Sequence, residues 1–257
     1  MQLQLGQITE MIHVASLIHD DVLDEAEMRR GGQAVHTMYT NKVAVLAGDY
    51  LLARASVLLA RLQHLQVVEV MASALDFLVQ GEIMQARSSK EDLLDMNFYL
   101  RKSYMKTASL ICNSCKSSAL LLGYSEEDVI TQSAEEFGYH LGMAYQIVDD
   151  ILDFTGASTQ LGKPAQADME LGLSTAPILF ASESVKELRP LIMRRFKEPG
   201  DVQRAVQLAQ GTDCVDKSYG LAEFHAQKAV DALMRLPKSE YQLALIRLLH
   251  VVIAREK

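Results

Sequence analysis

The sequence contains no Trp, only 5 Pro and only 3 Cys in 257 residues. Because proline interrupts helices, so few prolines favour long helices over strands and loops. Three cysteines are too few for a disulfide framework, which excludes the class of small disulfide-stabilised domains. Cys112 and Cys115 form one CxxC without a second pair, so two turns of an apolar helix are favoured over a zinc or redox site.

Basic charge is also in short supply. Lys and Arg number 25 against 33 Asp and Glu, which gives a formal net charge of -8. This balance argues against broad binding to nucleic acid or to an anionic membrane, although a local basic pocket for a small anion is compatible with it. No run of about 18 apolar residues free of charge occurs, so no transmembrane segment is predicted. The first residues lack the basic start of a signal peptide and the Arg and Ser bias of a transit peptide.

Hydrophobic residues make up 49% of the chain, enough for a large core. Most of them recur at the helical period of 3.6 residues. Helical tracts are predicted at residues 8–26, 42–62, 67–87, 88–123 and 125–156, a loop at 155–173, and shorter helices from 176 onward. No alternating strand pattern, fixed repeat or linker rich in Gly, Ser or Pro stands out. We therefore predict a single all-α domain over residues 1–257.

Two segments, residues 20–24 and 149–153, read Asp-Asp-x-x-Asp, and each ends an apolar helical tract. Residues i and i+4 share a helix face, so Asp20 projects together with Asp24, and the same holds in the second segment. Like charges at this spacing destabilise a helix modestly, so the duplication indicates a compensating cation. Carboxylates without His or Cys suit Mg²⁺, which binds one or two carboxylates together with phosphate oxygens and water. The alternative, two solvated acidic helix ends, is disfavoured by the second copy and the apolar context.

Basic residues accompany the acidic motifs. Arg29 and Arg30 follow the first motif, Lys106 lies with Thr107 in an apolar tract, and Lys163 follows the second motif. Each basic residue alone is typical of a solvated surface. Together with two metal-binding motifs they are what a diphosphate requires, because phosphate oxygens accept charge-assisted hydrogen bonds from Arg and Lys.

Several stretches resemble the trans-type (all-E) prenyl diphosphate synthases, namely residues 10–31, 42–55, 104–117, 142–156 and 161–181. Residues 192–205 resemble in particular the long-chain synthases of ubiquinone side-chain synthesis. The resemblance implies an all-α prenyl synthase bundle, usually dimeric, around a deep central cavity. It also implies a reaction that joins an allylic diphosphate to isopentenyl diphosphate with loss of pyrophosphate.

The resemblance implies two or three Mg²⁺ ions held by the carboxylates of both motifs: Asp20, Asp21, Asp24, Asp149, Asp150 and Asp153. It assigns the diphosphates to Arg29, Lys106 and Lys163 for the allylic substrate, and to Arg30 and His13 for isopentenyl diphosphate. Catalytic roles fall to Lys106, Lys163, Thr107 and Gln146, the last two as oxygen dipoles beside the carbocation. For His13, a plain core or surface role stays open. Metals and cations stabilise the leaving pyrophosphate, so no protein nucleophile is needed.

Product length is expected to depend on the helix that carries the first motif. Ala15 and Ser16 lie one turn before Asp20, where short-chain relatives place aromatic residues that close the pocket. Both residues are small here, and the next turn holds the aliphatic Met11 and Ile12. We therefore predict a long product, several isoprene units beyond farnesyl.

The sequence departs from the family in two places. It has no Gly-Gly-Lys-x-x-Arg-Pro segment before the first motif, so we expect a domain without the family's first helices. Leu173 stands where many relatives have Lys, which removes one phosphate contact.

Two alternatives to an autonomous synthase stay open. One is a non-autonomous or regulatory subunit of a heteromeric synthase, which the two intact motifs disfavour and the missing segment favours. The other is a terpene cyclase of the same fold, which rarely keeps both motifs. A homodimer or hetero-oligomer is expected, and a mitochondrial location is expected by analogy with ubiquinone-type synthases.

Overall fold

The computed structural model describes residues 1–156 and 166–255. The structure confirms the all-α prediction, with one small hairpin added. The elements are α1 (Gln2–Leu23), β1 (Met28–Arg29), β2 (Gly32–Gln33), α2 (Val35–Met38), α3 (Asn41–Arg61), α4 (Leu65–Arg87), η1 (Asp92–Leu94), α5 (Met96–Ser103), η2 (Tyr104–Ala108), α6 (Ser109–Leu120), α7 (Val129–Thr155), α8 (Ala167–Glu170), α9 (Ala176–Ser184), α10 (Leu188–Met193), α11 (Asp201–Ala209), α12 (Cys214–Leu233) and α13 (Glu240–Ile253).

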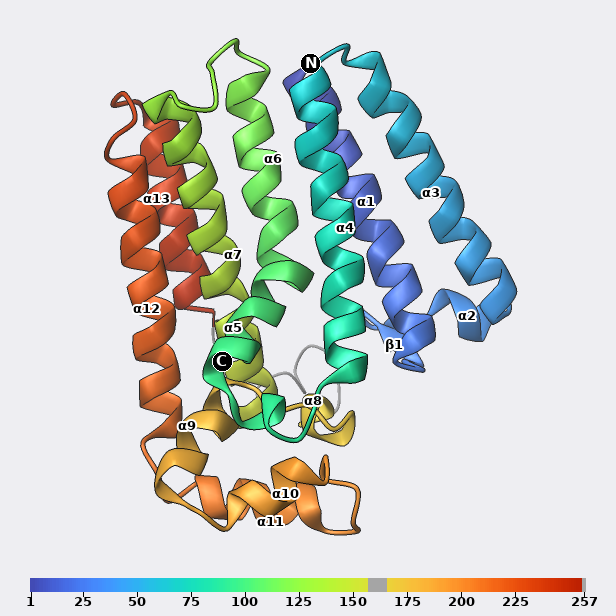
Figure 1. Cartoon of the computed structure of the whole chain (residues 1–257), viewed down its shortest axis with the longest axis vertical. Coiled ribbons are helices and arrows are strands. Elements are labelled where there is room, and N and C mark those ends of the chain that lie inside the picture. The colour runs from blue at the N-terminus through green and yellow to red at the C-terminus, as the bar shows by residue number, and fades with distance from the viewer. Residues whose placement is uncertain (157–165, 256–257) are drawn as a thin grey trace.

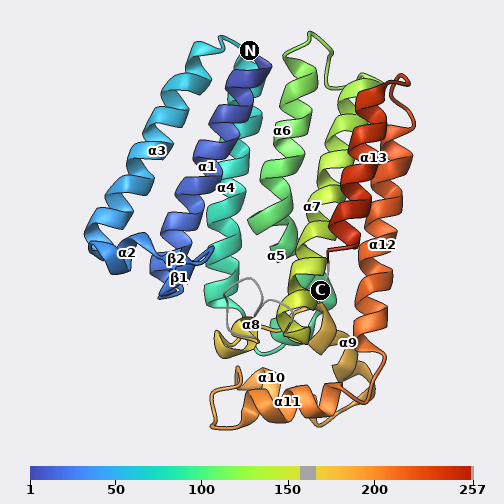
Figure 2. The same ribbon diagram turned by 180° about the vertical axis from the view of Figure 1, so that it is seen from behind.

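The long helices α1, α4, α6, α7, α12 and α13 run along one direction, with α3 leaning outward at one edge (Figure 1). The short helices α10 and α11 cross the lower end of the bundle (Figure 1). The view from behind places the hairpin at the foot of α1 and α8 near the foot of α7 (Figure 2). Both acidic motifs belong to the ends of helices that finish at this lower end, α1 and α7.

Helix boundaries follow from side-chain caps. The Thr40 hydroxyl accepts a hydrogen bond from the Val43 amide at 3.2 Å and begins α3. The Asp128 carboxylate accepts one from the Ile130 amide at 2.8 Å and begins α7. Gly156 ends α7 with a φ of 79°, a conformation that glycine adopts at little cost. These caps supply partners for amides and carbonyls that a helix end leaves open.

The centre of the bundle is a close contact of α7 with the segment formed by η2 and α6. A Cβ added to Gly142 would lie 2.5 Å from the Ala108 Cα, and one added to Gly138 would lie 2.7 Å from the Cys112 Cα. Only glycine permits such an approach between backbones. Cys112 is a free thiol, as is Cys115 on the same helix, which agrees with the helical interpretation of the CxxC.

The hairpin and the short helices α2 and α8 are features of regular structure that the sequence pattern did not predict. Met28 pairs with Gln33 and Arg29 with Gly32 in antiparallel register. The two residues between the strands have positive φ, 52° at Arg30 and 79° at Gly31, as a type I′ turn requires. The strands are too short to produce a visible alternation, so the sequence pattern predicts no strand there.

Helix α3 is unusually apolar on its outer side. Val43, Leu46, Tyr50 and Val57 are all exposed, while its other side packs against α1. By length and composition this one helix of the described residues could span a membrane, whereas the sequence had suggested no such segment. Helices of soluble proteins can share this length and composition, and Asp49 and Arg54 lie within α3. Only 22% of its most apolar stretch of 18 residues is buried, so most of the surface of α3 is available to a partner.

Candidate functional site

The first acidic motif lies on the last turns of α1. Asp20 and Asp24 are both half-buried, one turn apart. Burial raises the pKa of Asp20 to about 6, and the neighbouring Glu82 adds to the effect, while Lys106 opposes it. Burial likewise raises the pKa of Asp24. Ionisation of these two carboxylates therefore costs free energy unless a cation binds beside them.

The second residue of this motif has a different role. Asp21 is 4% exposed, and the hairpin brings Arg29 against it. The Arg29 Nε donates to the Asp21 Oδ1 at 2.8 Å, and a second guanidinium nitrogen donates to the same oxygen. Arg29 is thus engaged by the protein itself, although the sequence had suggested a diphosphate ligand. This pair fixes the hairpin to α1.

His13 is half-buried on α1, about two turns before Asp20. Burial lowers the pKa of His13, Glu10 opposes this shift, and the charges of Arg30 and Arg29 lower the pKa further. The charge of Arg30 thus acts on His13, and the assignment of both residues to one diphosphate stays a prediction.

Lys106 and Thr107 lie in η2, a π-helical turn between α5 and α6. The Lys106 ammonium forms an ion pair with Glu82 and lies 3.4 Å from the Gln85 Oε1. Both partners belong to α4, next to the first motif. A π-turn is a common device for directing side chains at functional sites.

A chain of hydrogen bonds connects η2 with the second motif on α7. Thr107 Oγ1 donates to Gln146 Oε1 at 2.5 Å, and Gln146 Nε2 donates to Asp150 Oδ1 at 2.7 Å. The Tyr99 hydroxyl donates to Asp150 Oδ2 at 2.6 Å. Asp150 is 3% exposed, and its burial raises its pKa. Asp150 therefore faces the protein interior, like Asp21 of the first motif.

The other two carboxylates of the second motif also have partners. Asp149 Oδ1 lies 3.7 Å from the Arg255 Nη2, which comes from beyond α13. Arg255 also stacks over the Tyr145 ring at 4.6 Å. Asp153 accepts hydrogen bonds from the amides of Ala167 at 3.0 Å and Asp168 at 3.3 Å, so it holds the start of α8. Asp149 and Asp153 were expected to project together, but in the structure they contact two different parts of the chain.

The donor chemistry of both motifs fits Mg²⁺. Within residues 1–156 and 166–255, no three His, Cys, Asp or Glu side chains converge into a site made of protein ligands alone. Mg²⁺ does not need such a cage, because it usually binds one or two carboxylates and completes its shell with phosphate oxygens and water. Lys163, predicted to bind a diphosphate, lies outside the described residues.

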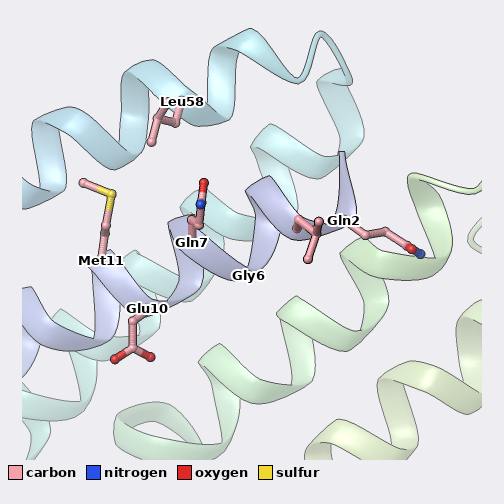
Figure 3. Close-up of a pocket in the computed structure, with 7 residues that line it drawn as sticks. Gln2, Gly6, Gln7, Glu10, Met11 and Leu58 are labelled. Atoms are coloured by element: carbon pink, nitrogen blue, oxygen red, sulfur yellow. The ribbon is translucent and has the colours of Figure 1, made fainter. Parts of the chain in front are cut away.

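The residues expected to control product length occupy two faces of α1. Ala15 and Ile12 are fully buried, and Ile12 belongs to a packed core formed with α3, α4 and α6. Ser16 and Met11 are half-buried. Met11 also lines an open surface groove of about 830 Å³ between the first half of α1 and Leu58 of α3. Figure 3 shows Met11 and Leu58 pointing into this space.

Four residues near the motifs were not predicted from the sequence: Tyr99, Lys102, Asp168 and Arg255. Lys102 could have been found, because it precedes Lys106 by four residues and so repeats a cation at helical spacing. Asp168 belongs to an acidic segment after the second motif. Tyr99 and Arg255 carry no local signal, because tertiary packing alone brings them to Asp150 and Asp149.

Residues 1–209 match the family described as Polyprenyl synthetase. The chain is 47% identical over 256 residues to decaprenyl-diphosphate synthase of Dictyostelium discoideum and 46% identical over 263 residues to a probable mitochondrial hexaprenyl pyrophosphate synthase of Neurospora crassa. Each match covers 100% of this chain and 55% and 58%, respectively, of the relative. The chain therefore spans little more than half the length of these relatives.

Solved structures share the fold. A polyprenyl synthase from Caulobacter crescentus, complexed with calcium and isoprenyl diphosphate, superposes with a TM-score of 0.89 at 32% identity. That match covers 99% of this chain and 78% of the other.

Proposed function

The chain belongs to the polyprenyl synthetase family, and from this premise we propose that it is a Mg²⁺-dependent prenyltransferase, which condenses an allylic diphosphate with isopentenyl diphosphate. The observation that carries the proposal is the pair of Asp-Asp-x-x-Asp motifs at the same end of the bundle, with Lys106 beside the first. The product proposed is a long-chain all-trans polyprenyl diphosphate.

The metal ions would be held by the outward carboxylates Asp20, Asp24 and Asp149. Bound there, two or three Mg²⁺ ions would neutralise the developing charge of the leaving pyrophosphate. The raised pKa values of Asp20 and Asp24 support this assignment, because burial without a cation is what penalises their charge. Asp21 and Asp150 would serve as buried supports for these ligands.

The cations of the site would hold the diphosphates in place. Lys106 would exchange its Glu82 partner for phosphate oxygens, and Arg30 with His13 would bind the second diphosphate. A carbocation formed after ionisation would meet the Thr107 oxygen. Because the Thr107 hydrogen is donated to Gln146, the hydroxyl lone pairs remain available to face positive charge.

A long product is compatible with the small residues on α1. An α-helix rises 1.5 Å per residue, so Met11 lies about 14 Å from Asp20 along the axis. The open groove at Met11 would leave room at the surface for the far end of a growing chain. We propose that this product supplies a quinone side chain and that the protein acts in mitochondria, by analogy with the relative named mitochondrial.

A second subunit is proposed to cover α3. The exposed Leu46 and Tyr50 give this helix an apolar outer face, which suits either another copy of the chain or a different synthase subunit. The second case is the alternative function, a non-autonomous subunit of a heteromeric synthase.

The test is an elongation assay with radiolabelled isopentenyl diphosphate and an allylic primer, on this chain and on a version extended at the N-terminus. Asp20→Ala and Asp149→Ala should each lower the rate by at least ~10²-fold, the scale for one preorganised electrostatic contact. Asp231→Ala is the matched control, since this exposed aspartate of α12 bonds only Gln227 in the described structure. Full activity of Asp20→Ala in Mg²⁺ would refute the assignment. Activity that requires a second synthase subunit would favour the alternative.

A further inference from the structure

Two histidines face one another where α12 packs along α7 (Figure 1). The Nδ1 atoms of His140 on α7 and His225 on α12 lie 2.8 Å apart. His225 is 5% exposed, and His140 is half-buried. His140 precedes Asp149 by about 14 Å along the axis of α7, so the pair lies outside the acidic motif. The two rings thus form a direct hydrogen bond between these helices.

Aromatic rings enclose this pair. Tyr139 contacts His140 edge to face, with 4.9 Å between the ring centroids, and Phe224 contacts His225 in the same way at 5.5 Å. Among the described residues, His19 alone has a carboxylate oxygen within 4 Å of a histidine ring nitrogen. Neither member of the pair therefore has an acidic partner, so a positive charge on either ring would lack a counter-ion.

The hydrogen bond requires the two neutral rings to hold different tautomers. One imidazole carries its proton on Nδ1 and donates it to the unprotonated Nδ1 of the other. A single added proton would place an imidazolium among aromatic rings, and a second would leave two N–H groups pointing at each other. Burial, together with the proximity of His140, lowers the pKa of His225 to about 4, which agrees with a pair that is neutral at pH 7.

The charged groups that act on the pair belong to the same two helices. Burial lowers the pKa of His140, Lys228 adds to this shift, and Glu136 and Asp231 oppose it. The segment η2 adds only the Tyr104 phenol, which stays neutral because burial raises its pKa to about 12. In the part of the chain that the structure describes, no charged side chain of α6 or α13 shifts the pKa of either histidine.

We propose that the His140–His225 pair is an acid-sensitive contact, which holds α12 against α7 while both rings are neutral and loosens when the pair takes up protons. The inference goes beyond the proposed function, because it concerns helix packing and needs no substrate. The stability that neutral His225 contributes is complete above about pH 6.5 and is lost as the pH falls toward about 4. Carboxyls with raised pKa values, such as Asp20, act in the opposite sense, so variants of the pair are needed to isolate its effect.

Hydrogen–deuterium exchange of the full chain, resolved into peptides by mass spectrometry at pH 7.5 and pH 5.0, measures the opening of α12. After correction for the intrinsic exchange rate, the opening constant of Cys214–Leu233 should rise by about 10- to 30-fold at pH 5.0, as a fall in pKa from 6.5 to about 4 predicts. His225→Asn places an amide that does not titrate near the position of Nδ1, and it should reduce this rise to within about threefold. His250→Asn is the matched control, because His250 is exposed on α13, and it should keep the full rise.

A nuclear magnetic resonance titration of the histidine rings in the wild type does not depend on the folding of a variant. His225 should stay neutral down to about pH 5, and one ring of the pair should carry its proton on Nδ1 and the other on Nε2. Titration of His225 together with a histidine peptide in the same buffer would overturn the proposal. So would equal opening of α12 at both pH values, or an acid response that persists unchanged in His225→Asn.

Discussion

Replacing Asp20 by Asn should make the metal-free protein more stable at pH 8. Burial and the neighbouring Glu82 raise the pKa of Asp20 from 3.8 to about 6, so the folded chain favours its neutral form. Ionisation of Asp20 therefore destabilises the fold, and this penalty develops as the pH rises from about 4 to about 6 and is complete above that. A shift of about two pKa units corresponds to roughly 3 kcal/mol, and partial contact with solvent reduces this to roughly 1–3 kcal/mol.

Urea denaturation followed by far-UV circular dichroism in a chelating buffer provides the measurement. Asp20→Asn should raise the free energy of unfolding by roughly 1–3 kcal/mol at pH 8 and change it little at pH 4, where the wild-type carboxyl is already neutral. Added Mg²⁺ should stabilise the wild type more than the variant, because a ligand that binds only the folded state stabilises it. With Mg²⁺ present, the difference in the free energy of unfolding between the variant and the wild type at pH 8 should then shrink or change sign.

Asp21→Asn is the matched control within the same motif. Asp21 is buried and bound to Arg29, so its replacement leaves the half-buried Arg29 guanidinium without its anionic partner. Loss of one member of a fully buried pair costs roughly 3–5 kcal/mol, and the 26% exposure of the Arg29 side chain reduces this cost. The two neighbouring substitutions should therefore change stability in opposite directions at pH 8. Equal or lower stability of Asp20→Asn at pH 8, or a gain of the same size at pH 4, would refute the reasoning.

Three further predictions follow from the packing. Gly142→Ala should lower the free energy of unfolding by about 1–3 kcal/mol in urea, because its Cβ would lie 2.5 Å from the Ala108 Cα, and unchanged stability would contradict the close contact. Tyr99→Phe should cost about 1.5–3 kcal/mol in the same assay, since a buried carboxylate, Asp150, loses a hydrogen-bond donor, and a neutral effect would argue against that bond. Ser16→Phe should shorten the product on thin-layer chromatography of dephosphorylated products from the N-terminally extended version. An unchanged product distribution would remove Ser16 from the control of chain length.

Ser16 is a better position than Ala15 for testing the control of product length. Ala15 is fully buried, so an aromatic ring at that position would overpack the core and confuse loss of folding with loss of chain length. Sequence reasoning treated the two positions alike, because both precede Asp20 by about one turn. Their burial distinguishes them.

The helices could be predicted because their apolar residues recur at a period of 3.6, and the acidic motifs because their chemistry is local. Partners that come from elsewhere in the chain could not be predicted in the same way. Arg255 reaches Asp149 only because α13 packs beside α7. The hairpin depends on Arg30, a residue without the flexibility of glycine that nevertheless adopts a positive φ. In each case a tertiary contact determines the local arrangement, and no short sequence pattern encodes that contact.

The role of Arg29 has a similar explanation. Sequence spacing placed it near the first motif, which is correct, but spacing alone does not distinguish a residue that binds substrate from one that binds Asp21. The buried carboxylate requires a donor and Arg29 supplies it, while the assignment of Arg29 to the allylic diphosphate stays a prediction. Burial cannot be read from a motif in which adjacent aspartates look alike.

The π-turn at Tyr104–Ala108 has a consequence for insertions and deletions. Each residue of an α-helix advances the side chains by about 100°, and a π-turn accommodates one residue more than an α-turn does. Removing one residue from η2 would therefore convert the π-turn into an α-turn and leave α6 close to its present orientation relative to α5. Removing one residue from within α6 would instead turn the rest of that helix by about 100°, so that Leu120 would leave the core. A scan of single-residue deletions should therefore find the fold more tolerant of a deletion in η2 than of one inside α6, although a deletion in η2 would separate Thr107 from Gln146.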